Sequence, residues 1–104
     1  METVKAISLS VKPVKAELDS VKSTKAKTMT VKWKQDKKAT GYYISYSTDK
    51  NFKKNVINYM VSKGTDTSTK ITGLTSGKTY YVHVCAEDSG LKGDYSDVKK
   101  VKIK

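Results

Sequence analysis

The clearest pattern of hydrophobic and polar positions runs from Thr79 to Glu87. Every second residue in this stretch is apolar, which is the period of a β-strand with one buried face. The predicted buried face consists of Tyr80, Val82, Val84 and Ala86. The predicted outward, half-exposed face consists of Tyr81, His83, Cys85 and Glu87. We therefore expect a long strand here, against which the other elements pack.

Six further stretches have the short alternating pattern of strands. They are bounded by polar or glycine-containing segments, as strands in antiparallel sheets usually are. Within the first of them the apolar period breaks between Leu18 and Val21, which indicates an edge strand with a β-bulge. The expected strands cover residues 16–21, 28–34, 42–47, 56–61, 69–72 and 98–103.

Two of the segments that connect the expected strands have features of their own. The polar segment Thr48 to Asn55 contains Phe52, and we expect this ring to cover one end of the core. The segment Asp88 to Asp94 is rich in turn-forming residues and is expected to be a loop.

About seven short strands without a helical period predict an all-β fold, a two-sheet antiparallel immunoglobulin-like sandwich. The chain of 104 residues is long enough for one domain with one hydrophobic core. We place this domain at residues 13–104, after a linker or extra N-terminal strand segment at residues 1–12.

A family resemblance rests on the corner before the long strand. The spacing Leu74-x-x-Gly77-x-x-Tyr80 resembles the tyrosine corner of Greek-key sandwiches, in which the phenol hydroxyl bonds to backbone a few residues upstream. We expect the Tyr80 hydroxyl to bond to a backbone carbonyl of the corner. Together with Trp33 on an earlier strand, it makes the chain similar to fibronectin type III modules. The predicted structural core is Trp33, Tyr42, Ile44, Tyr46, Ile71, Leu74, Tyr80, Val82 and Val84.

The resemblance is strongest to modules of secreted and surface multidomain proteins of Gram-positive bacteria. It implies a secreted or cell-surface location, with any signal peptide outside this chain. It also implies that the two termini leave from opposite poles, so that the module sets the spacing of neighbouring domains of the same polypeptide.

The charge balance adds a second class of partner. The chain has 21 lysines, no arginine and 10 acidic residues, for a formal net charge of +11. Lysine alone supports a diffuse, salt-sensitive attraction to polyanions such as anionic cell-wall polymers, whereas specific nucleic-acid readout relies largely on arginine. We therefore expect no specific nucleic-acid binding. No apolar run is long enough for membrane insertion.

Enzymatic chemistry is not expected. His83 is the only histidine and Cys85 the only cysteine, and their Cα atoms two residues apart on a strand lie roughly 6.5–7 Å from each other. This spacing is long for a nucleophile and its base, and two ligands do not complete a zinc site. We predict no catalytic residue, no metal and no cofactor.

Ligand contacts are expected in two places. Tyr43, Tyr81 and His83 form an amphipathic outer patch with Cys85, suited to a glycan, a host protein or a neighbouring domain. Lys92-Gly93-Asp94 lies in the loop where an animal fibronectin module carries its Arg-Gly-Asp motif. The leading hypothesis is a non-catalytic spacer or interaction module, and the alternatives are glycan or protein adhesion and lysine-mediated attachment.

Overall fold

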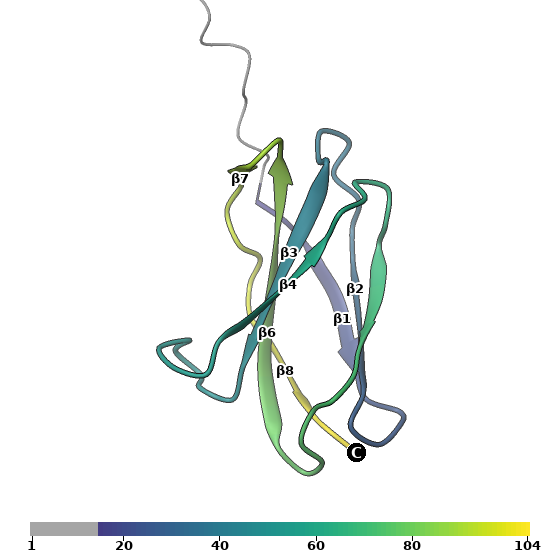
Figure 1. The fold of residues 1–104 in the computed structure, drawn as a ribbon, viewed down its shortest axis with the longest axis vertical. Helices are drawn as coiled ribbons and strands as arrows, with labels where there is room; N and C mark the ends of the chain where they lie inside the picture. Colours follow the sequence, from purple (N-terminus) through teal and green to yellow (C-terminus); the bar gives the residue numbers. More distant parts are fainter. Residues whose placement is uncertain (1–14) are drawn as a thin grey trace, which may run out of the picture.

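The computed structural model describes residues 15–104, so the predicted segment 1–12 lies outside the described residues. Strands and connecting loops make up this part of the chain, and no helix in it could cross a membrane. The strands are β1 (Leu18–Lys22), β2 (Met29–Trp33), β3 (Gly41–Ser47), β4 (Ile57–Val61), β5 (Ser68–Ile71), β6 (Thr79–Asp88), β7 (Leu91–Lys92) and β8 (Lys99–Lys102) (Figure 1).

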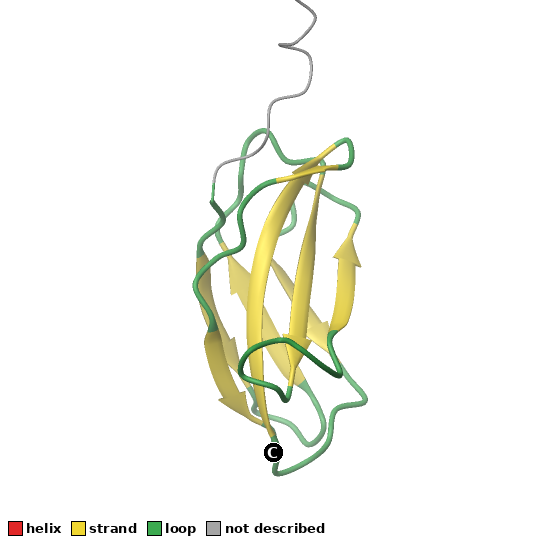
Figure 2. Ribbon diagram, turned by 90° about the vertical axis from the view of Figure 1, so that its left-hand side faces the viewer, coloured by secondary structure: helices red, strands yellow, loops and turns green. Residues whose placement is uncertain are grey.

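The strands form two antiparallel sheets that lie face to face (Figure 2). One sheet has the order β1-β2-β5. The other has the order β4-β3-β6-β7, with β8 also paired to β6. This arrangement confirms the predicted all-β, immunoglobulin-like sandwich.

The β-bulge expected in the first strand is present. Leu18 pairs with Trp33 but Ser20 pairs with Lys32, so the register of β1 against β2 shifts between Leu18 and Ser20. Because β1 is an edge strand, the extra residue does not disrupt a second ladder. The shift brings Leu18 into the core, although the apolar residues of this strand do not alternate regularly.

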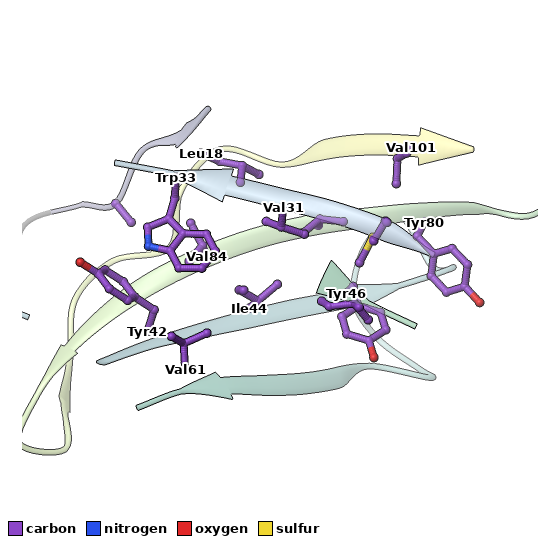
Figure 3. Packing of buried hydrophobic residues seen from close by; sticks show 14 of the residues in the cluster. Leu18, Val31, Trp33, Tyr42, Ile44, Tyr46, Val61, Tyr80, Val84 and Val101 are labelled. Carbon is purple, nitrogen blue, oxygen red and sulfur yellow. The ribbon is translucent and has the colours of Figure 1, made fainter. Parts of the chain in front are cut away.

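The core lies between the two sheets and is centred on Trp33. The indole is almost fully buried and packs against the ring of Tyr42, with 5.3 Å between ring centroids (Figure 3). The nine residues proposed for the core from the sequence are all buried. They are joined by Ala16, Leu18, Met29, Val31, Val61, Ala86, Val101 and Ile103.

The predicted tyrosine corner is present, with one difference in its chemistry. Tyr80 is buried, and its hydroxyl accepts a hydrogen bond from the N–H of Thr75 at 3.0 Å. A backbone carbonyl was the expected partner, and the observed partner is an amide. Gly77 has φ of +82°, a left-handed conformation that glycine adopts without strain, and this allows the tight turn before β6.

The C-terminal part of the sandwich differs from the prediction in two ways. The segment expected to be a loop, 88–94, is a short hairpin in which Glu87 pairs with Lys92 and Asp88 with Leu91, and this gives eight strands rather than about seven. The last strand begins at Lys99, so Val98 precedes it and is exposed. The side-chain period was misread there, because Val98 and Val101 are three positions apart and residues an odd number of positions apart cannot share a strand face.

Candidate functional site

The outer face of the five-stranded sheet carries a stack of three rings. His83, on β6, lies between Phe52 and Tyr95. The centroid of its imidazole is 4.2 Å from that of Phe52 and 3.9 Å from that of Tyr95, and both pairs are nearly parallel. Both faces of the imidazole are therefore covered by other side chains, and His83 is half-buried.

The position of Phe52 corrects the prediction that its ring covers one end of the core. The loop between β3 and β4 folds over the outer face of the sheet instead. Asp49 organises this loop, because its carboxylate accepts the N–H groups of Asn51 and Lys53 at 3.1 and 2.9 Å. Phe52 itself has φ of +55°, a conformation that the polar and hydrophobic pattern could not indicate.

The environment of His83 favours its neutral form. Burial lowers the pKa of the imidazole, since the charged form loses hydration between the two rings. A neutral imidazole is compatible with aromatic stacking on both sides. The arrangement gives His83 a structural role in holding the 48–55 loop and the 93–98 segment on the sheet.

Cys85 lies on the outward face of β6 as expected, but it is fully buried rather than half-exposed. The segment after β7 is fixed beside it, because Ser96 donates its N–H to the carbonyl of the preceding residue, Val84, at 2.7 Å, and the Ser96 hydroxyl accepts the N–H of Val84 at 3.0 Å. Burial raises the pKa of the Cys85 thiol, although a hydrogen bond to Tyr95 opposes this shift. A protonated, enclosed thiol is a poor nucleophile.

Within residues 15–104, no cluster of three or more His, Cys, Asp or Glu side chains is placed to hold a metal ion. His83 and Cys85 lie two residues apart on the same strand, and both contact Tyr95, His83 through ring stacking and Cys85 through its thiol.

Tyr43, His83 and Tyr81 lie on the same outer face of β3 and β6, but the ring stack at His83 stands between the two tyrosines. In the register of β3 and β6, Tyr43 lies opposite Cys85, whereas Tyr81 lies opposite Ser47, four residues further along β3. Tyr43 is covered by Lys92, whose Nζ is 4.3 Å from the ring centroid and forms a cation–π contact. The two tyrosines therefore present two separate surfaces.

Tyr81 lies in a shallow surface concavity of about 530 Å³. The 48–55 loop forms one wall, and β8 with the residue before it forms the other. Cationic, amide, aromatic and aliphatic groups all reach this concavity. Its lining residues are Lys50, Asn51, Tyr81, Val98 and Lys100.

Lys92-Gly93-Asp94 lies along the sheet rather than at a loop tip. Lys92 is in β7, Gly93 is buried and donates its N–H to the carbonyl of Ala86 at 2.8 Å, and the carbonyl of Asp94 accepts the N–H of Ala16 at 3.3 Å. The turn that projects beyond the sheet consists of Ser89 and Gly90 (Figure 1).

Two features of this surface were missed at the sequence level. Tyr95 completes the ring stack, and no local pattern indicates this, because its partner His83 is twelve residues earlier in the sequence. The strand β4 exposes several large apolar side chains, and here a signal was present: residues 55–62 contain no charged residue, although lysines lie on both sides.

Comparison with known proteins supports a modular domain. Residues 16–102 match the model of the family described as "Purple acid Phosphatase, N-terminal domain". A curated "Kelch domain-containing protein" from Sulfurisphaera tokodaii is 35% identical over 95 residues, which are 91% of this chain. The chain spans 12% of the length of that relative.

Solved structures with the same fold include three fibronectin type III proteins. The FN1–FN3 domains of chicken CNTN1 have a TM-score of 0.72 at 24% identity, covering 91% of this chain and 33% of that one. The FN5 domain of Drosophila Lar has a TM-score of 0.72 at 22% identity, covering 88% and 96%. An Fn3-like protein from Clostridium thermocellum has a TM-score of 0.68 at 19% identity, covering 93% and 96%.

These likenesses show the fold, and the match over residues 16–102 shows the family. The chain therefore belongs to the family of purple acid phosphatase N-terminal domains, and its fold is that of a fibronectin type III module.

Proposed function

We propose that this domain is a non-catalytic spacer and interaction module of a larger extracellular bacterial protein. The observation that carries the proposal is the position of the two ends of the described chain. Residue 15 lies at the pole of the β6–β7 hairpin, whereas Lys104 lies at the opposite pole (Figure 1). Domains attached at the two ends would be held apart by the length of the sandwich.

Both ends are fixed to the body of the domain, as a spacer requires. At the first pole the N–H of Ala16 bonds to the carbonyl of Asp94. At the second, the N–H of Lys104 donates to the Ser23 hydroxyl at 3.0 Å, and its carbonyl accepts the N–H of Lys27 at 3.1 Å. These contacts fix the direction in which the chain enters and leaves.

The relative from Sulfurisphaera tokodaii supports a place within a longer chain, since the matched segment is a small part of that protein. The secreted or cell-surface setting belongs to the proposal through the resemblance to modules of Gram-positive bacteria. A non-catalytic role agrees with the site geometry, which brings together no nucleophile and base.

A distance measurement tests the spacer role. The full chain is placed between two fluorescent proteins, and the distribution of energy-transfer efficiencies is measured on single molecules. We expect one narrow distribution that stays the same in moderate denaturant until the domain unfolds. A control glycine-serine linker of 90 residues should give a broad distribution, with a root-mean-square span of roughly 50 Å. A distribution as broad as that of the linker would contradict the proposal.

A second candidate function is attachment to an acidic glycan or cell-wall polymer through the concavity at Tyr81. Lys50 and Lys100 supply positive charge on both sides of an aromatic platform, and the Asn51 amide can hydrogen-bond to hydroxyl groups. Tyr81→Ala should reduce retention on polygalacturonate, whereas Tyr43→Ala, in the separate Lys92 contact, should not. Equal retention of both variants and the parent chain would contradict this site.

A further inference from the structure

Four large apolar side chains are exposed together on β4 and the residue before it. Val56, Ile57, Tyr59 and Met60 keep between 37% and 54% of their surface accessible. The core-facing side of the strand is also open. Ile57, Tyr59 and Val61 face the core, and only Val61 is buried. A cluster of this kind in a chain with 30% charged residues indicates an interaction surface.

The backbone of β4 is available as well as its side chains. β4 is the last strand in the order β4-β3-β6-β7 and pairs with β3 over five consecutive residues without a bulge. In an antiparallel edge strand, alternate N–H and C=O groups point away from the sheet. Within residues 15–104, no backbone hydrogen bond outside the ladder with β3 involves Ile57–Val61.

The edge strands β1, β5 and β8 are protected against strand addition, and the edge strand β7 has only two residues. β1 has a bulge and exposes Asp19 and Lys22. β5 exposes Lys70, and β8 exposes Lys99, Lys100 and Lys102. Bulges and lysines are the usual means by which edge strands avoid pairing with other chains. β4 has neither, nor a proline, and its register and composition favour pairing.

The positive charge around β4 favours an acidic partner at this edge. Lys53 and Lys54 precede the strand and Lys63 follows it, and all three are exposed. A second copy of the chain would bring another charge of +11 to the interface. An acidic partner would instead be attracted to both ends of the strand.

We propose that β4 is a strand-addition site for an extended apolar segment, flanked by acidic residues, of a partner protein. The added strand extends the five-stranded sheet, and its backbone bonds to the outer edge of Ile57–Val61. One set of its side chains lies beside Ile57 and Tyr59, and the alternate set beside Met60. The edge is accessible whether or not the two poles carry domains, because β4 lies between the two poles and not at either of them (Figure 1).

Peptide binding to the full chain tests this site. The probe is the labelled peptide Glu-Glu-Val-Thr-Val-Thr-Val-Glu-Glu, whose central five residues match the length of β4, and binding is followed by fluorescence polarisation. We expect saturable binding that weakens with salt, and slower amide hydrogen exchange at Ile57–Val61 in the complex. The same peptide with lysines in place of the glutamates should bind at least tenfold more weakly, and so should hexaglutamate.

Matched variants separate the edge from general surface hydrophobicity. Ile57→Thr with Met60→Thr keeps charge and strand propensity but removes apolar surface, and should weaken binding at least tenfold. The control, Leu91→Thr with Val98→Thr, changes residues that are 38% and 47% exposed elsewhere and should bind as the parent chain does. Thermal melts of both variants confirm that each is folded.

Several results would overturn the proposal. One is equal binding of the parent chain and the β4 variant, and another is equal binding of the glutamate and lysine peptides. A third is exchange protection that falls outside β4. If the parent chain binds no peptide but forms a dimer in sedimentation equilibrium that the β4 variant does not form, the occupant is a second copy and the acidic partner is rejected.

Discussion

At the scale of single residues, Tyr80 combines two functions in one side chain. Its ring fills the end of the core, 6.1 Å from the ring of Tyr46, while its hydroxyl accepts the Thr75 N–H. Replacing Tyr80 with Phe keeps the ring but leaves that amide without its partner. We expect a loss of about 1–3 kcal/mol in the free energy of unfolding.

Urea denaturation of Tyr80→Phe checks this expectation. Tyr81→Phe is the matched control, since its hydroxyl makes no hydrogen bond within residues 15–104, and it should stay within about 0.5 kcal/mol of the parent chain. If both variants are equally stable, the hydroxyl at the corner does not stabilise the fold.

His83 should make stability depend on pH. Because burial lowers its folded pKa below the ordinary value of 6.5, the unfolded chain binds more protons than the folded chain just below that pH. The free energy of unfolding should therefore fall as pH decreases from about 7 to about 5. Asp49 and Asp97 titrate below this window, since hydrogen bonds from the Asn51 amide and from Lys15 lower their pKa values under 3.8.

Thermal melts across this range compare the parent chain with His83→Phe, which retains a ring in the stack and cannot be protonated. The variant should show a flatter dependence. A parent chain that becomes more stable in acid would mean that cation–π contacts of the charged imidazole outweigh its desolvation.

Whether a side chain could be placed from the sequence depended on how local its surroundings are. Tyr80 is fixed by its own strand period and by a turn three residues away, so the pattern placed it correctly. Cys85 has the same strand period, but it is fully buried, and its thiol contacts Tyr95, which is ten residues further along the chain. Phe52 depends on a positive φ that no alternation of polar and apolar residues reveals.

At the scale of elements, Tyr42 joins two loops at the same end of the sandwich. Its hydroxyl accepts the N–H of Asp36 at 2.9 Å and donates to the carbonyl of Gly64 at 2.8 Å. The loops are packed so closely that a Cβ on Gly64 would lie 1.9 Å from the carbonyl oxygen of Ala39. Because that oxygen belongs to the backbone, it cannot move aside at little cost.

We therefore expect Gly64→Ala to lower the free energy of unfolding by about 1–3 kcal/mol, as overpacking does. Urea denaturation measures the change, and Thr65→Ala, at the exposed neighbouring residue, should have little effect. A stable Gly64→Ala variant would show that the two loops separate without cost.

The strands themselves were accessible to sequence analysis because each carries its own two-residue period. The solvent exposure of a strand could not be predicted in this way, because it depends on which strand lies at the edge of the sheet. Ile57 and Tyr59 lie on the same side of β4 as the buried Val61, yet they remain exposed while Val61 is covered. The same two-residue period is therefore found in a buried central strand and in an exposed edge strand, and only the order of strands in the sheet distinguishes them.

At the scale of the whole molecule, the excess of lysine acts on stability as well as on binding. The formal charge of +11 is spread over a small domain, and ion pairs such as Lys15–Asp97 and Lys34–Glu17 are exposed. Exposed pairs contribute little, so repulsion among the lysines dominates the electrostatic energy of the compact state. Since salt screens this repulsion, the folded domain should become more stable as ionic strength rises.

Thermal melts in 10 and 150 mM NaCl test this expectation, because the screening length falls from about 30 to about 8 Å. Each 1 kcal/mol of relieved repulsion raises Tm by about 4–8 °C in a domain of this size, and we expect a rise of that order.

Substituting exposed lysines with glutamine at Lys22, Lys32, Lys70 and Lys102 should raise Tm at low salt and reduce its salt dependence. The double variant Lys15→Gln with Lys34→Gln removes lysines that form ion pairs. It should raise Tm by a smaller amount per lysine removed than the variant with the other lysines replaced. A fall in Tm with added salt would mean that attraction between opposite charges, rather than lysine repulsion, governs the fold.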